Sequence, residues 1–135
     1  MSWDIFVQDL PRDAKSIEDI PQDFRPKPIL PRKRIVEVFQ EVAPFTDFSD
    51  PTWWNVHCDA FSIEVNIRAE DPCSGFALHV RGSSEAAGFV AEVLQRLGVR
   101  ALDPSSETGF FELERSREGF RKWQAYRDQI VSKKG

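Results

Sequence analysis

Cysteine is scarce in this sequence, and long apolar runs are missing. Cys58 and Cys73 are its two cysteines, too few for a disulfide framework, so we expect reduced thiols. No apolar stretch approaches the ~20 residues that cross a bilayer. The first residues include Asp4 but no basic residue, unlike a secretory signal. These absences predict a cytoplasmic protein without a membrane segment.

Motifs of common active sites are missing as well. The sequence contains no P-loop, no glycine fingerprint for dinucleotides and no nucleophile elbow. His57, Cys58, Cys73 and His79 carry atoms that bind zinc, but neighbours such as His57 and Cys58 point to opposite faces of a strand. We therefore expect no metal and no cofactor. Because no nucleophile can be nominated, a non-enzymatic role is favoured, and enzymatic activity is left open.

Acidic residues outnumber basic ones, 22 to 18, which gives a formal net charge of −4. This balance argues against nucleic acid as the main partner. The charges lie in blocks: residues 1–24 and 37–71 are mainly acidic, whereas residues 25–34 and 115–134 are mainly basic. Such blocks either pair with one another in the fold or bind a partner. Nucleic-acid binding through the two basic blocks is a third and weaker hypothesis.

Hydrophobic periodicity predicts an α+β fold in a single domain over residues 1–135. The content of 41% hydrophobic residues, with 11 Phe and 4 Trp, is enough for a substantial core. Alternation with a period of two predicts strands at residues 3–8, 53–58, 61–68, 76–81 and 99–102. Apolar residues spaced by three and four predict helices at residues 31–43, from Ser83 or Ser84 to Leu97, and at 117–132.

The remaining segments are predicted to lack helix and strand. Residues 9–31 contain five prolines, so we expect a proline-rich extended arm there, and residues 45–52 are expected to form a loop. The order of elements predicts a mixed or antiparallel sheet of about five strands, with two or three helices packed mainly on one face.

Two consecutive predicted strands, 61–68 and 76–81, bring polar side chains to one face of the sheet. In a hairpin, one register sets Asn66 opposite His79 and Glu64 opposite Arg81. A shift by two sets Glu64 opposite His79 and Ser62 opposite Arg81. Either register predicts a polar face made of Ser62, Glu64, Asn66, Arg68, His79 and Arg81. Such a face is suited to proton transfer or anion capture, whereas the simpler interpretation is a solvated surface with ordinary ion pairs.

Two smaller features are further candidates for binding. Trp53 and Trp54 are adjacent in a predicted strand, so one should enter the core and the other should contact a ligand or partner, unless the last helix or the arm covers it. The junction of Arg81, Gly82, Ser83 and Ser84 precedes a helix, where backbone N–H groups can hold an anion. A plain capped helix is the simpler alternative.

Several segments resemble a set of small uncharacterised bacterial proteins. They are MSWD at 1–4, PQDFRP at 21–26, FSDPTW at 48–53, FSIEVNI at 61–67, LHVRG at 78–82 and LGVRALD at 97–103. The similarity spans most of the chain and implies no catalytic motif. In size, acidity and predicted architecture the sequence is also similar to immunity proteins, which neutralise bacterial toxins.

Together these features favour a non-enzymatic bacterial protein that acts by binding a protein partner, in an immunity-like or regulatory role. The alternative is a protein that binds a small molecule or an anion, or an enzyme, and that uses Glu64, Asn66, His79 and Arg81.

Overall fold

The computed structural model describes residues 3–82, 84–112 and 117–134, which form six strands and three α-helices. The strands are β1 (Trp3–Gln8), β2 (Asp47–Asp50), β3 (Trp53–His57), β4 (Phe61–Ile67), β5 (Gly75–Gly82) and β6 (Arg100–Leu102). The helices are α1 (Arg32–Val42), α2 (Ser84–Leu97) and α3 (Arg117–Lys134). None of the helices in the described part of the chain is long and apolar enough to cross a membrane.

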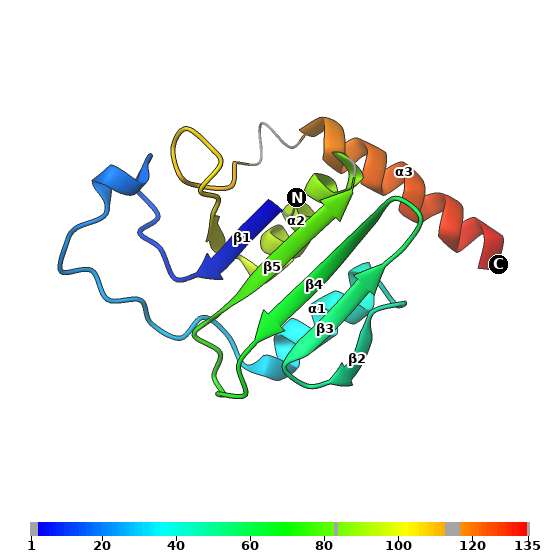
Figure 1. The fold of residues 1–135 in the computed structure, drawn as a ribbon, viewed down its shortest axis with the longest axis horizontal. Coiled ribbons are helices and arrows are strands. Elements are labelled where there is room, and N and C mark those ends of the chain that lie inside the picture. Colours follow the sequence, from blue (N-terminus) through cyan, green and yellow to red (C-terminus); the bar gives the residue numbers. More distant parts are fainter. Residues whose placement is uncertain (1–2, 83, 113–116, 135) are drawn as a thin grey trace.

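The six strands form one antiparallel sheet in the order β2-β3-β4-β5-β1-β6. Helices α1 and α2 lie behind this sheet in the view of Figure 1, and α3 crosses one end of it. Without β2 and β3, the chain has the connectivity of a split β-α-β-β-α-β motif. Its elements in chain order are β1, α1, β4, β5, α2 and β6. Strands β2 and β3 extend that motif at one edge.

The hydrophobic core lies between the sheet and the helices. In β4 and β5 every second residue is buried, and in α1 the buried residues Ile35, Val38 and Phe39 recur at helical spacing. The ring of Phe39 lies at the centre, with ring centroids 5.4 Å from Trp54 and 6.0 Å from Phe89. The core is therefore built from the apolar face of the strands and the apolar face of the helices.

The predicted α+β class is confirmed, with six strands where the sequence predicts about five. The additional strand is β2, in the segment predicted to be a loop. Its pairing with β3 shifts register between Asp47 and Asp50, and three of its four residues are exposed. A short edge strand of this kind is defined by backbone pairing, so it leaves no alternation of apolar residues for sequence analysis to detect.

Residues 9–31 run along the surface in an extended course, with one 3-10 turn at Ile17–Asp19. Backbone hydrogen bonds attach this segment to the domain: the Ile29 amide donates to the Cys73 carbonyl, and the Cys73 amide donates to the Leu30 carbonyl. Nearer the start of the segment, the Ile17 amide donates to the Thr108 carbonyl. The following helix α1 begins directly after Pro31, which removes a backbone donor where the helix has no partner for it.

Candidate functional site

The sheet face turned away from α1 and α2 carries most of the predicted site residues, and we call it the open face (Figure 1). The alternation of the strands assigns side chains to it, since their chain neighbours are buried in the core. The open face comprises Asp4, Phe6, Asp47, Trp53, Asn55, His57, Ser62, Glu64, Asn66, Ala77, His79 and Arg81.

The register between β4 and β5 sets Glu64 opposite His79 and Ser62 opposite Arg81, the second of the two arrangements considered. The first, with Asn66 opposite His79, is wrong, because Asn66 lies opposite Ala77. This register continues into the neighbouring strands and produces a row across the sheet. The row runs Asp47, Asn55, Glu64, His79 and Asp4.

His79 is held between an aromatic ring and a carboxylate. The Trp53 indole stacks on the His79 imidazole with ring centroids 6.0 Å apart and an interplanar angle of 21°. On the other side, Nδ1 of His79 lies 2.8 Å from Oδ1 of Asp4. A carboxylate on Nδ1 orients the imidazole ring, as it does in many proton-transfer sites. This arrangement gives the middle of the open face one fixed, half-buried histidine.

Glu64 lies beside His79 without bonding to it. The carboxylate is half-buried between Asn55 and His79 in the row, and it makes no hydrogen bond or ion pair with any residue that the structure describes. Such a carboxylate is partly dehydrated and has unused acceptor capacity. It is therefore an available acceptor in the middle of the open face.

The side chains of Trp53 and Trp54 point to opposite faces of the sheet, as expected for neighbours in a strand. Trp54 is buried, 1% exposed, and its ring packs against Phe39 and Phe48. Trp53 is 38% exposed and remains on the open face, so neither α3 nor the proline-rich segment buries it. Phe6 is equally exposed and lies on the same face in β1.

Asn66 and Arg68 differ from the other four predicted polar residues in that they line a depression. They line a shallow depression of about 340 Å³ at one end of the open face, together with Phe6, Gln8 and Glu70. Glu64, His79 and Arg81 do not line this depression. The predicted six-residue face is therefore divided, because only Asn66 and Arg68 of its members line this depression.

The junction before α2 is only partly described. Arg81 lies opposite Ser62 on the open face and is exposed, and Ser84 is the first residue of α2. Ser83 lies outside the described residues. Gly82 has a φ of +130°, and a Cβ atom there would lie 2.7 Å from Cα of Phe61 and 2.8 Å from the Ala60 carbonyl oxygen. This glycine thus permits a close approach of two backbones, which explains its presence without a bound anion.

The four residues with zinc-binding atoms lie in separate places. His57 is exposed on the open face, Cys58 is half-buried beside Tyr126, and Cys73 is buried against the Leu30 backbone. Burial raises the pKa of the Cys73 thiol. Among the residues described, no three histidines, cysteines or carboxylates cluster where they could hold a metal ion.

Asp4 is the site residue that sequence analysis missed. It belongs to β1, which is separated from β5 by about seventy residues of chain, and only the strand order places it opposite His79. The available signal was the alternation of β1, which puts Asp4 and Phe6 on the face opposite Ile5 and Val7. That signal does not reveal which strand lies next to β1.

Comparison with known proteins finds no matching family model, no matching curated protein and no matching solved structure. The function must therefore be argued from the residues of this chain.

Proposed function

We propose that this protein is a non-enzymatic binding protein whose open face docks a protein partner that presents a basic surface. The observation that carries the proposal is the exposed Trp53 ring, held in place by its stack on His79. An ordered, exposed tryptophan loses little conformational freedom on binding, and tryptophan is enriched among residues that dominate binding energy.

The charges beside this ring support a basic partner. Asp47, Glu64 and Asp4 lie in one row of the open face, and Glu64 has no partner among the described residues. A lysine or arginine of the partner placed over the Trp53 ring would gain a cation–π interaction and could also reach Glu64. The exposed Arg81 lies at the side of this row, where it would disfavour a partner that is basic throughout.

The size of the open face is compatible with the centre of an interface. Five strands spaced by about 4.8 Å and about six residues long make a surface of roughly 500 Å². A standard interface buries about 800 Å² on each partner, so residues around the sheet must contribute the rim. The resemblance to immunity proteins suggests a basic bacterial toxin as one such partner.

Affinity purification with matched variants tests this proposal. Wild-type protein, Trp53→Ala, Glu64→Gln and the control Asp13→Asn would each be used to capture partners from cells that express the protein naturally. Asp13→Asn removes the same charge at an exposed position outside the open face. We expect one basic protein that is retained by wild type and Asp13→Asn but lost with Trp53→Ala.

Affinity measurements on that purified partner complete the test. Truncation of a central tryptophan should weaken binding by about 2 kcal/mol or more, which is about thirtyfold. Glu64→Gln should weaken binding less and reduce its dependence on salt. Equal affinity of Trp53→Ala and wild type would contradict a role for the open face.

The alternative function, binding of a small molecule or anion through Glu64, Asn66, His79 and Arg81, has one favourable observation. The depression beside Asn66 and Arg68 has a volume typical of small-ligand sites, about 340 Å³. However, three of those four residues lie outside it. A compound that shifts the NMR signals of Asn66 and Arg68 but is indifferent to Trp53→Ala would favour this alternative over a protein partner.

A further inference from the structure

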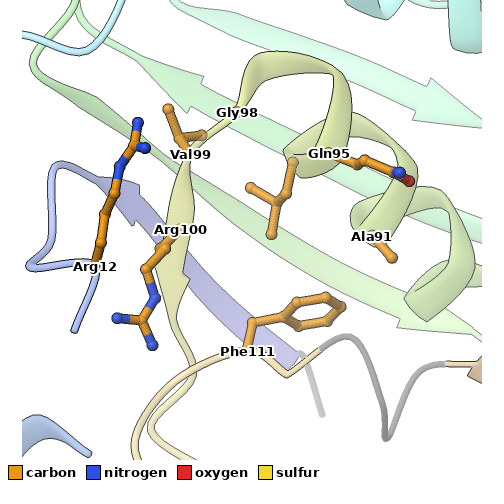
Figure 2. A pocket seen from close by; sticks show the side chains of 8 residues that line it. Arg12, Ala91, Gln95, Gly98, Val99, Arg100 and Phe111 are labelled. Carbon is orange, nitrogen blue, oxygen red and sulfur yellow. The ribbon is translucent and has the colours of Figure 1, made fainter. Parts of the chain in front are cut away.

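A second candidate site lies at the opposite edge of the sheet from β2, between β6, the end of α2 and the segment that follows β1. It is a pocket of about 380 Å³ (Figure 2). Its apolar lining comes from Ala91, Leu94, Val99 and Phe111, and Gln95 supplies an amide. None of these residues belongs to the open face, so this site is independent of the proposed partner surface.

Two arginines line one side of this pocket, and they differ in their bonding (Figure 2). Nη1 of Arg100 donates to the carbonyl oxygens of Pro11 and Ala14, at 2.5 and 2.9 Å, and its guanidinium lies 4.0 Å from the centre of the Phe110 ring. The Arg100 guanidinium thus already binds the backbone of residues 11–14. Residues 11–14 include a turn, and Arg12 in this turn lines the pocket.

Arg12 is exposed, and its guanidinium makes no hydrogen bond or ion pair with a residue that the structure describes. A cation beside an apolar pocket is complementary to a ligand with one anionic end and one apolar end. We infer that this pocket binds a small amphipathic carboxylate, with the carboxylate on Arg12 and the apolar part against Leu94, Val99 and Phe111.

The surroundings favour a carboxylate over a phosphate. The pocket includes Gly98, directly after the C-terminal end of α2, where the helix dipole places partial negative charge. A phosphate dianion would be repelled more strongly there than a monoanion. The volume corresponds to roughly a dozen heavy atoms at about 30 Å³ each, the share that a water molecule takes in the liquid. Octanoate and similar medium-chain or aryl carboxylates are within that size.

A titration of isotope-labelled protein with octanoate, followed by NMR, tests the inference. We expect the amide signals of Ala91, Gly98 and Val99 to shift with a common saturation curve. Butyrate should bind at least tenfold more weakly, because each methylene that is buried adds up to about fourfold in affinity. Octanol lacks the carboxylate that would bind Arg12, so its affinity should measure the contribution of the apolar lining alone.

Matched charge variants separate the role of Arg12 from general electrostatics. Arg12→Gln should weaken octanoate binding about threefold to tenfold and leave octanol binding unchanged. Lys15→Gln removes the same charge from an exposed position of the same segment that does not line the pocket, so it should bind octanoate like wild type. Arg12 is exposed, so the variant should retain the wild-type spectrum when free.

Three outcomes would overturn the inference. The first is the absence of any shift at about 10 mM octanoate, a concentration tenfold above a weak Kd of ~1 mM. The second is a set of shifts confined to residues outside the pocket. The third is equal octanoate affinity of Arg12→Gln and wild type. None of these outcomes bears on partner binding by the open face.

Discussion

Trp53 reaches across β4 to stack on His79. Trp53 belongs to β3 and His79 to β5, so the indole must extend over the intervening strand for the two ring centroids to lie 6.0 Å apart. Asp4, in β1 on the far side of β5, contacts the same imidazole. Side chains from three strands therefore order the middle of the open face.

Replacement of His79 by alanine should release the Trp53 ring. We expect the indole N–H resonance of Trp53 to shift and Trp53 to become more accessible to a collisional quencher, because the stack that orders it is lost. The fold should be retained, since His79 lies outside the core. His57→Ala is the control, because His57 is the other histidine and is exposed on the same face. An unchanged indole resonance in His79→Ala would contradict the observed stack.

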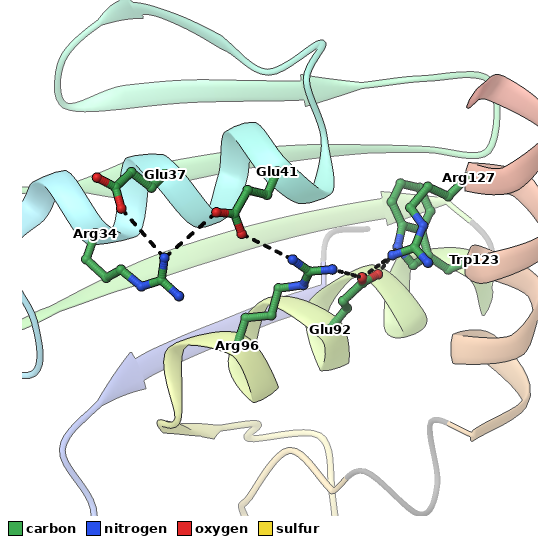
Figure 3. A network of polar contacts seen from close by, with 7 residues as sticks. All are labelled: Arg34, Glu37, Glu41, Glu92, Arg96, Trp123 and Arg127. Atoms are coloured by element: carbon green, nitrogen blue, oxygen red, sulfur yellow. Dashed lines mark hydrogen bonds and ion pairs between the residues drawn. The ribbon is translucent and has the colours of Figure 1, made fainter. Parts of the chain in front are cut away.

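Glu92 should be a principal stabiliser of the contact between α2 and α3 (Figure 3). Its carboxylate, with 6% of the side chain exposed, accepts from Nε1 of the buried Trp123 at 2.6 Å, from Arg96 at 3.1 Å and from Arg127. Glu92→Ala leaves these donors without their acceptor and should lower the free energy of unfolding by about 3 kcal/mol.

The matched control for this change is Glu41→Ala. Glu41 also bonds to Arg96, but its side chain is 49% exposed, so its removal should cost at most about 1 kcal/mol. Urea denaturation measures both values, and hydrogen exchange should show loss of protection in α3 for Glu92→Ala only. Equal destabilisation by the two substitutions would argue against the network.

The two glycines that flank α2 should respond very differently to alanine. At Gly82, with φ +130°, a Cβ would lie 2.7 Å from Cα of Phe61, so Gly82→Ala should cost about 3 kcal/mol or more. At Gly98, with φ +69°, an added Cβ would meet no side chain or backbone beyond its immediate chain surroundings within 4 Å, so Gly98→Ala should cost only the left-handed conformation, about 1–2 kcal/mol. Thermal or urea unfolding of both variants measures the difference, and a reversed order would contradict the close approach at Gly82.

Tyr126 should ionise at a higher pH in the folded protein than in the unfolded chain. Burial raises its pKa above the ordinary value of 10.0, and a hydrogen bond with Cys58 and the nearby Asp59 carboxylate raise it further. Because Tyr126 is the only tyrosine, phenolate absorbance reports on it alone. We expect the folded protein to titrate above the same protein in denaturant, and Asp59→Asn to reduce the difference.

The consequence for stability has a definite sign. The folded state holds the phenol proton more tightly than the unfolded chain does, so the contribution of Tyr126 is complete below pH 10. It decreases as the pH rises from the unfolded pKa toward the folded one. If the absorbance of folded and unfolded protein rose at the same pH, the burial of Tyr126 against Cys58 would be contradicted.

Much of the open face could be predicted from the sequence, for a local reason. A strand sends alternate side chains to opposite faces, so the patterns in β4 and β5 place Ser62, Glu64, His79 and Arg81 together whatever the rest of the chain does. The separation of Trp53 from Trp54 follows from the same geometry. The choice between the two hairpin registers did not follow, because both bury the same apolar residues.

The features that depend on distant segments could not be predicted in this way. Two of the three residues that bond to Glu92, Trp123 and Arg127, come from α3. The residues around the pocket beside Arg12 come from the segment after β1, from α2 and from β6. Nothing in the spacing of apolar residues along α2 marks Glu92 as buried. Its burial is decided by where α3 packs.

The sequence by itself determined the three helices, every strand except β2, and the division of those strands into an apolar and a polar face, since these depend on spacing along the chain. Only the tertiary structure decided that Asp4 lies beside His79, that the Trp53 ring crosses β4, and that Arg12 borders an apolar pocket. Those relationships depend on the strand order and on helix packing, which bring together side chains far apart in the sequence.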